Sequence, residues 1–227
     1  MTTRPHPAAA ARRLSLSRKG RGAVVALLVL AGCGADYQPA VPKGGAAASA
    51  SGKTATAIFA GGCFWCTEAD FEKVPGVVSA VSGYTGGTVP NPTYEQVSAD
   101  ATGHYEAVRV TYDPARVSYP ALVDYYFRTV DPTDAGGQFC DRGSSYRTAI
   151  FVAGPAQRQA AEAEKAEVDA LLEAPVATPV LPAGEFYPAE EYHQDYYKKN
   201  SLKYKFYRSR CGRDARLAEV WGERPKG

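Results

Sequence analysis

Two cysteines separated by two residues are the side chains best suited to covalent chemistry. Cys63 and Cys66 lie in the segment GGCFWCTE (residues 61–68), directly after an apolar run at residues 56–60. The run predicts a buried strand, and the residues that follow, up to the Pro-Gly pair at 75–76, predict one or two helical turns. The first N–H groups of a helix lack partners within it, and with the helix dipole they favour an anion. We therefore expect Cys63 to be a thiolate nucleophile, with Cys66 on the same helical face.

The same spacing fits other chemistry. A C-x-x-C motif after a strand is typical of a thioredoxin-like dithiol/disulfide oxidoreductase, which would use Cys63 and Cys66 as its redox pair. A zinc site uses similar spacing, but the second Cys/His pair that it needs does not occur in the expected form, and we predict no metal. A cysteine that only packs in the core would not explain the two glycines and the aromatic neighbours.

Further motifs follow in order along the chain. They are SGYTGG at 82–87, PNPTY at 90–94, TGHYEAV at 102–108, YDP at 112–114, DPT at 131–133, DRGSSYR at 141–147 and AEEYHQ at 189–194. With GCFW at 62–65, these motifs resemble the A-type peptide methionine sulfoxide reductase family in order and spacing, from about Thr56 to Tyr197. One departure is Cys66, where many members of that family carry glycine, and it leaves the identity of the resolving cysteine open.

The resemblance implies a peptide-methionine (S)-S-oxide reductase, which reduces methionine S-sulfoxide, free or in proteins, and so repairs oxidative damage. Cys63 would attack the sulfur. Phe64 and Trp65 would form an apolar pocket for the methyl group, and Glu106 would donate a proton. Tyr94 and Tyr146 would be the two phenols that bind the oxyanion, and Asp141 would orient the site. A carboxyl group desolvated beside aromatic rings keeps its proton and can donate it, and phenols stabilise a developing oxyanion. Without the resemblance, Glu106 would be assigned to the solvent face of a strand, and His104 and His193 only to loops.

The reaction would leave Cys63 as a sulfenic acid, which a second thiol condenses to a disulfide. The resemblance favours Cys211, in a segment that looks like the family's mobile tail. Cys66 is the alternative, but a disulfide across one helical turn requires local unwinding. Cys140 is the third candidate, and a structural role suits it better. No bound cofactor is expected, and an external thioredoxin-like thiol reductant would restore the enzyme.

The N-terminus predicts export. Residues 1–33 combine a basic segment with an apolar run at 23–31 that is too short to span a bilayer. The run ends in LAGC, which looks like a bacterial lipobox, so we expect lipidation of Cys33, with an ordinary secretory signal or a short anchor as the alternative. Residues 34–53 are rich in Ala, Gly, Ser and Pro and predict a flexible tether. The expected location is extracytoplasmic, as a membrane-anchored lipoprotein, on the periplasmic side if the cell is Gram-negative.

Residues 54–227 are long enough for one domain with a real core, the expected catalytic domain. The chain has 26 basic and 24 acidic residues, so its formal net charge is +2. The sequence contains no basic stripe that would indicate nucleic-acid binding. We also expect a monomer. Patterning predicts strands at 77–82, 105–112, 147–152 and 176–181 and helices at 120–130 and 156–172. These elements favour an α/β or α+β fold. The resemblance implies a two-layer sandwich on a mixed sheet, with a ferredoxin-like core and an extended C-terminal tail.

Overall fold

The computed structural model describes residues 39–42 and 52–222, and every structural statement below concerns these residues. They belong to the unit that spans residues 34–227. The predicted signal at 1–33, with Cys33, and most of the predicted tether lie outside the described residues. Within residues 39–42 and 52–222, none of the helices has the length and apolar character needed to cross a membrane.

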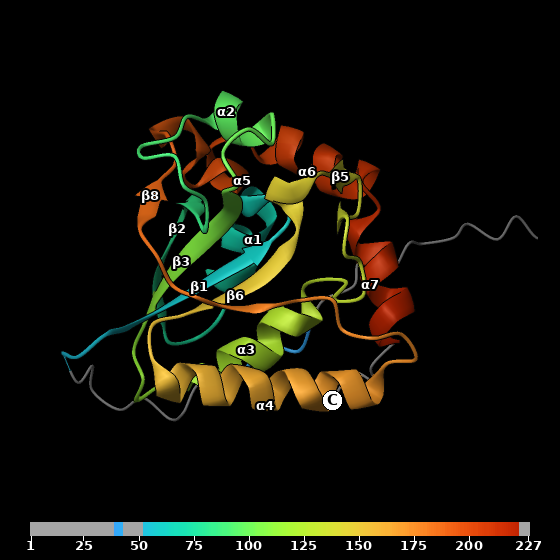
Figure 1. The fold of residues 1–227 in the computed structure, drawn as a ribbon. Coiled ribbons are helices and arrows are strands. Elements are labelled where there is room, and N and C mark those ends of the chain that lie inside the picture. The colour runs from blue at the N-terminus through green and yellow to red at the C-terminus, as the bar shows by residue number, and fades with distance from the viewer. Residues whose placement is uncertain (1–38, 43–51, 223–227) are drawn as a thin grey trace, which may run out of the picture. The chain divides into compact units, whose positions relative to one another are not determined.

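A six-stranded mixed sheet forms the centre of the fold (Figure 1). Its strands, in spatial order, are β7 (Val180–Pro182), β6 (Thr148–Val152), β1 (Ala55–Gly61), β3 (Tyr105–Tyr112), β2 (Val77–Thr85) and β8 (Phe186–Pro188). Neighbouring strands pair antiparallel, except that β6 and β7 are parallel. The order β6-β1-β3-β2, with α1 after β1 and α3 (Tyr119–Arg128) before β6, is the split βαβ arrangement of ferredoxin-like folds. The mixed α+β fold predicted from the sequence is confirmed.

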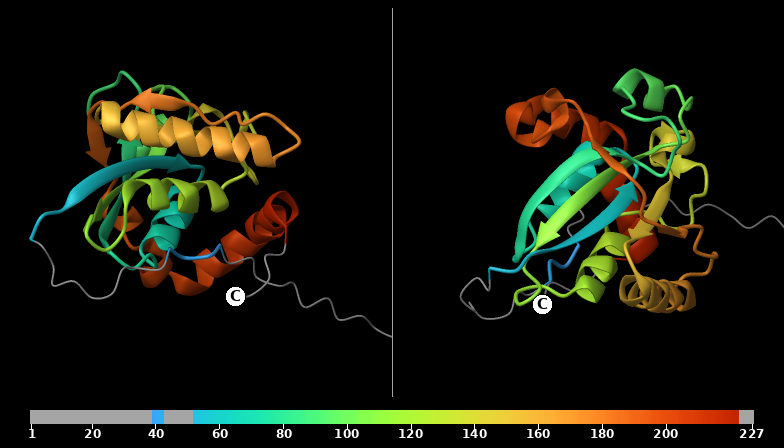
Figure 2. Two further views of the ribbon diagram at one scale, coloured as in Figure 1. Left: turned by 90° about the horizontal axis from the view of Figure 1, so that it is seen from below. Right: turned by 60° about the vertical axis from the view of Figure 1, so that its left-hand side comes forward.

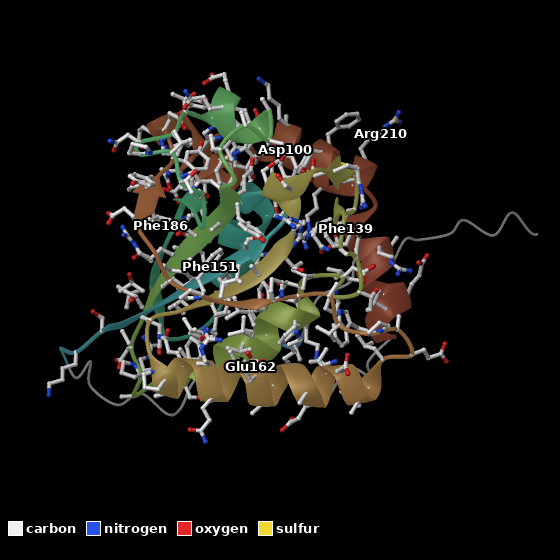
Figure 3. The ribbon with its side chains drawn as sticks, in the orientation of Figure 1. Asp100, Phe139, Phe151, Glu162, Phe186 and Arg210 are labelled. Carbon is white, nitrogen blue, oxygen red and sulfur yellow. A yellow bond between two sulfur atoms is a disulfide. The ribbon has the colours of Figure 1, made fainter. Side chains whose placement is uncertain are left out.

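Two helices cover the same face of strand β1. The ring of Phe59 stacks on Phe71 of helix α1 (Phe64–Phe71), with centroids 4.8 Å apart, and on Tyr126 of α3 at 5.0 Å. Helix α4 (Pro155–Leu171) packs beside α3 and against β6 and β7, as the two further views show (Figure 2). A smaller apolar cluster that includes Phe151 and Phe186 packs elsewhere on the sheet (Figure 3). The stacking of Phe59 on Phe71 and Tyr126 therefore fixes the position of β1 relative to α1, and with it the junction between the two elements.

Short elements complete the connections. They are α2 (Tyr94–Ser98), β4 (Gly137–Gln138), β5 (Asp141–Arg142), the 3-10 turns Ser144–Tyr146 and Glu191–His193, and helices α5 (Tyr196–Lys199), α6 (Ser201–Arg210) and α7 (Arg213–Trp221). The strand predicted at 176–181 is only the three residues of β7, because Pro179 directly before it has no N–H to donate to a sheet.

The C-terminal segment differs from the expected extended tail, because it is largely helical. Residues 201–210 contain no Gly or Pro, and half of them are Leu, Lys or Arg, which favour helix. Arg208 of α6 is buried and pairs with Asp70 of α1 at 3.1 Å and with Asp214 of α7 at 2.7 Å. Burial acts to raise the pKa of Asp70, but the Arg208 and Arg213 cations outweigh it and lower that pKa. These buried charges hold α6 against α1, because separating either partner would leave an uncompensated charge in the core.

Candidate active site

The junction between β1 and α1 places Cys63 at the N-cap of the helix. Gly62 before it has a φ of +78°, and a Cβ there would lie 2.5 Å from the Cβ of Gln138, so only glycine fits. Cys63 itself has non-helical angles (φ −51°, ψ 118°), and its carbonyl accepts the N–H of Cys66 at 3.1 Å. The predicted strand-to-helix position of the cysteine is therefore confirmed.

Cys63 and Cys66 are free thiols, and both are buried, with 6% and 1% of their surfaces exposed. The two side chains interact, and each changes the pKa of the other. Burial raises the pKa of the Cys63 thiol well above its ordinary value, and the interaction with Cys66 adds to this effect. The interaction with Cys63, together with the cations of Arg213 and Arg208, lowers the pKa of Cys66 to about 7 against the opposing effect of burial.

Burial therefore acts against the thiolate that the sequence predicted at Cys63. The N-terminus of α1 does not offset this effect, because one of its amides already has another partner. The N–H of Phe64 donates to a carboxyl oxygen of Glu106 at 3.0 Å, so the amide that would favour a thiolate is occupied. Burial thus raises the pKa of Cys63, while the Arg213 and Arg208 cations favour the charged form of Cys66.

Glu106 lies on β3, opposite Tyr84 of β2, and is buried. Burial raises the pKa of its carboxyl to about 8, although the bond from Phe64 acts in the opposite direction. The predicted desolvation of this carboxyl is confirmed, and at neutral pH the group carries a proton. The assignment of Glu106 to an exposed strand face, which composition alone would favour, does not hold.

A pocket of about 270 Å³ opens at Cys63. Its lining contains the predicted nucleophile, methyl-pocket residues, acid, phenols and aspartate, with one addition, Tyr207: Cys63, Phe64, Trp65, Tyr94, Glu106, Asp141, Tyr146 and Tyr207. The phenols of Tyr94 and Tyr146 interact, and each affects the pKa of the other. Burial raises the pKa of Tyr94 to about 12 and that of Tyr146 further, so both phenols keep their protons for donation. The fold thus gathers seven predicted residues from separate elements around one cavity.

Residues behind the pocket wall hold its aromatic side chains. The indole N–H of Trp65 donates to Nδ1 of His193 at 3.0 Å, and the Trp65 ring stacks on Tyr196 with centroids 3.8 Å apart. Glu190 accepts the hydroxyl of Tyr84 at 2.8 Å and the backbone N–H of Tyr94 at 2.9 Å. Burial lowers the pKa of His193, which favours the neutral ring that accepts this bond. The AEEYHQ motif indicated Glu190 and His193 as a block, but not what they contact.

His104 lies outside this lining. Its Nδ1 accepts the N–H of Gly87 at 3.0 Å, and its Nε2 is 2.8 Å from the carbonyl oxygen of Val89. The ring therefore shapes the loop after β2, as expected from the sequence.

Cys140 and Cys211 form a disulfide, with Cα atoms 4.9 Å apart. Cys140 is exposed, whereas Cys211, the C-cap of α6, is half-buried. The hydroxyl of Tyr207, one turn before Cys211, donates to the Asp141 carboxylate next to Cys140. The two predicted resolving candidates are thus placed differently, since Cys66 is free beside Cys63 and Cys211 is paired with Cys140.

The strain argument against Cys66 also changes. It assumed that both cysteines lie inside the helix, but Cys63 is the N-cap with ψ 118°. Its side chain is not held in helical geometry, which would prevent two sulfurs that lie one turn apart from forming a bond.

Two groups of possible metal ligands occur among the described residues, each with atoms within 4.8 Å of one another. In the group Cys140, Asp141 and Cys211 the sulfurs are joined as the disulfide. In the group Glu68, Glu72 and Asp195, the Lys198 ammonium already pairs with Glu72 and Asp195. We assign a metal to neither.

Comparison with known proteins gives one family. A family model described as peptide methionine sulfoxide reductase matches residues 55–225. Peptide methionine sulfoxide reductase MsrA 2 of Caulobacter vibrioides is 59% identical over 178 residues, which are 78% of this chain and 90% of the relative. The MsrA of Bacillus licheniformis is 50% identical over 174 residues, covering 76% and 96% of the two chains.

Solved structures agree with the sequence relatives. Methionine sulfoxide reductase A of Corynebacterium diphtheriae superposes with a TM-score of 0.60 at 38% identity, over 66% of this chain and 76% of the other. Reduced Mxr1 of Saccharomyces cerevisiae superposes with a TM-score of 0.63 at 32% identity, over 66% and 88%.

Proposed function

The chain belongs to the peptide methionine sulfoxide reductase family, in its A type, and from this premise we propose how its residues perform the reaction. The activity is the thiol-dependent reduction of methionine sulfoxide to methionine. The dithiol oxidoreductase alternative is not favoured, because the relatives are sulfoxide reductases and both cysteines of the C-x-x-C motif are buried.

The chemical step takes place in the pocket at Cys63. The substrate methyl group lies against Phe64 and Trp65, and the sulfoxide oxygen faces Glu106 and the phenols of Tyr94 and Tyr146. Glu106 gives its proton to the oxygen while the Cys63 sulfur attacks, and Cys66, in the same buried cluster as Cys63, takes the thiol proton. The oxygen passes to Cys63 as a sulfenic acid, and methionine leaves. The observation that carries this proposal is a protonated, buried carboxyl in one pocket with the free thiol.

The oxidised enzyme has to be reduced from the surface, because a protein reductant cannot contact sulfurs as buried as those of Cys63 and Cys66. We propose that Cys66 first condenses with the sulfenic acid, which forms a Cys63–Cys66 disulfide and releases water. The reduced pair Cys140 and Cys211 then exchanges with it and becomes a disulfide, while Cys63 and Cys66 return to thiols. Cys211, the predicted resolving residue, thus acts second, and the free and paired cysteines of the structure match the end of this sequence.

We call this transfer of the disulfide from Cys63–Cys66 to Cys140–Cys211 the relay. Its order predicts that two variants trap different species. Starting from fully reduced protein without reductant, Cys211→Ser should convert one equivalent of sulfoxide and accumulate a Cys63–Cys66 disulfide. Cys66→Ser should accumulate the sulfenic acid on Cys63, which dimedone traps. Peptide mass spectrometry after one turnover distinguishes them. A sulfenic acid in Cys211→Ser, together with normal thioredoxin-coupled turnover of Cys66→Ser, would mean that Cys211 captures the sulfenic acid directly.

The reductant that opens the Cys140–Cys211 disulfide is an external thioredoxin-like protein, and the enzyme needs no bound cofactor. Its substrates are free methionine sulfoxide or oxidised proteins, with preference for the S epimer at sulfur. A monomer suffices for this chemistry, because one chain supplies every residue of the pocket.

We also propose that the enzyme works outside the cytoplasm, held by lipid on Cys33. The support is the basic segment, the short apolar run and the LAGC sequence. Cys33→Ala should stop acylation and release the protein from washed membranes, because a single lipid group and not a spanning helix is the anchor. Fractionation and metabolic labelling with a fatty acid check this. Tight membrane binding by the variant after a carbonate wash would instead indicate a retained helix.

A further inference from the structure

The outer face of helix α6 carries exposed apolar side chains. Leu202 is 83% exposed and Phe206 is 71% exposed, the two highest values among the large hydrophobic residues that the structure describes. They are four residues apart and therefore neighbours on one side of the helix. Tyr204 and Arg208, on the other side, are buried against α1. The exposed Leu202 and Phe206 therefore add no stability to the fold and are available to contact a partner.

The same face is positively charged. Lys203, Lys205 and Arg210 are exposed, and none of them makes an ion pair with another described residue. Arg210 points away from the body of the protein (Figure 3). The stretch 196–213 contains seven Lys and Arg residues and no Asp or Glu. The face is therefore complementary to an acidic partner surface with an apolar centre.

The outer face of α6 lies close to the Cys140–Cys211 disulfide, which indicates that a partner bound there would act on this disulfide. Helix α6 ends at Cys211, whose disulfide partner Cys140 is exposed. Its inner side bears Tyr207, which lines the pocket at Cys63. A molecule that attacks the surface disulfide must approach the C-terminal end of α6. Arg210 is the last residue of the helix, Phe206 lies about one turn before that end, and Leu202 and Lys203 lie about two turns before it.

We propose that the outer face of α6, formed by Leu202, Lys203, Phe206 and Arg210, is the docking surface for the protein reductant. The reductant would present its dithiol within an apolar patch that is bordered by acidic residues. Phe206 and Leu202 would supply the buried centre of the contact, and the cations would steer the encounter. The proposal rests on the relay described above, because it assumes that the Cys140–Cys211 disulfide is the one reduced from outside.

The test compares two reductants for the same variants. Turnover is measured with thioredoxin, kept reduced by thioredoxin reductase and NADPH, and separately with dithiothreitol, which needs no docking surface. Phe206→Glu and the double variant Lys203→Glu/Arg210→Glu should raise the KM for thioredoxin by about tenfold or more. Turnover with dithiothreitol should stay unchanged. The wild-type KM for thioredoxin should also rise with added salt, and less so in the double variant.

The controls introduce glutamate at exposed apolar and basic positions elsewhere. Leu171→Glu lies on α4, where Leu171 is 66% exposed, and Arg116→Glu lies in the loop before α3, where Arg116 is also exposed. Neither should change the KM for thioredoxin. An unchanged KM in the α6 variants would overturn the proposal, as would an equal loss with both reductants. Loss of binding to vesicles of phosphatidylcholine and phosphatidylglycerol, with unchanged thioredoxin kinetics, would assign the face to a membrane instead.

Cys211→Ser separates this proposal from the relay. If Cys211→Ser stops thioredoxin-coupled turnover while Phe206→Glu does not, the relay holds and the docking surface lies elsewhere. If Cys211→Ser turns over normally with thioredoxin, the relay itself is wrong.

Discussion

Replacing Cys63 with serine should reduce the rate of sulfoxide reduction by roughly 10³-fold or more, because a hydroxyl is a far weaker nucleophile than a thiol at neutral pH. No other described residue can replace it, since Cys66 lies behind it and does not line the pocket. The measurement is a single turnover, in which methionine formed from methionine sulfoxide is quantified by chromatography. Cys140→Ser is the control, and its chemical step should keep the wild-type rate.

The Cys63→Ser variant should also be well folded, which makes the result interpretable. Cys63 occupies the N-cap of α1, and serine is among the residues preferred at that position. Thermal unfolding should therefore show a Tm no lower than that of the wild type. Appreciable methionine formation by the folded variant would show that another group attacks the sulfur.

Glu106→Gln should slow the chemical step by about 10²- to 10⁴-fold, because the amide cannot give a proton to the sulfoxide oxygen. Its carbonyl oxygen can still accept the N–H of Phe64, so the position of the helix start should be kept. Glu106→Asp retains an acid at a shorter reach and should be affected less. Rapid-quench single turnovers check the three proteins, with Glu95→Gln on the exposed helix α2 as control. A wild-type rate in Glu106→Gln would make this carboxyl a bystander.

The pH dependence follows from the raised pKa of Glu106. The reacting form is the protonated acid, so its contribution is fully present well below about pH 8 and is lost as the pH rises through that value. The wild-type single-turnover rate should therefore fall on the alkaline side with an apparent pKa near 8. In Glu106→Gln this alkaline decrease should be absent, because the titrating group has been removed.

Much of the fold could be predicted from local patterns. The alternating and β-branched residues at 105–112 predicted β3 with the bounds that the structure has. The helix predicted at 156–172 is α4 within one residue at each end, because its composition strongly favours helix. The C-terminal segment shows the limit of such reasoning. Its resemblance to a mobile tail suggested an extended chain, whereas buried pairs of Arg208 with Asp70 and Asp214 hold it as helices.

The sequence by itself determined the residue types of the site. A cysteine after a Gly-Gly pair, adjacent aromatic residues, and motifs in a family's order are local features, and they identified seven of the eight pocket residues. Tyr207 was missed because fifteen tyrosines offer no local signal that singles one out.

Only the tertiary structure decided the state of these groups. The bond from the N–H of Phe64 to Glu106 joins residues 42 positions apart. Burial keeps the proton on Glu106 and raises the pKa of Cys63. The Cys140–Cys211 pair closes a separation of 71 residues, which no spacing rule predicts. Protonation and disulfide pairing depend on desolvation and on distances across the fold. Residue order therefore specifies which groups react, and packing specifies in which state they begin.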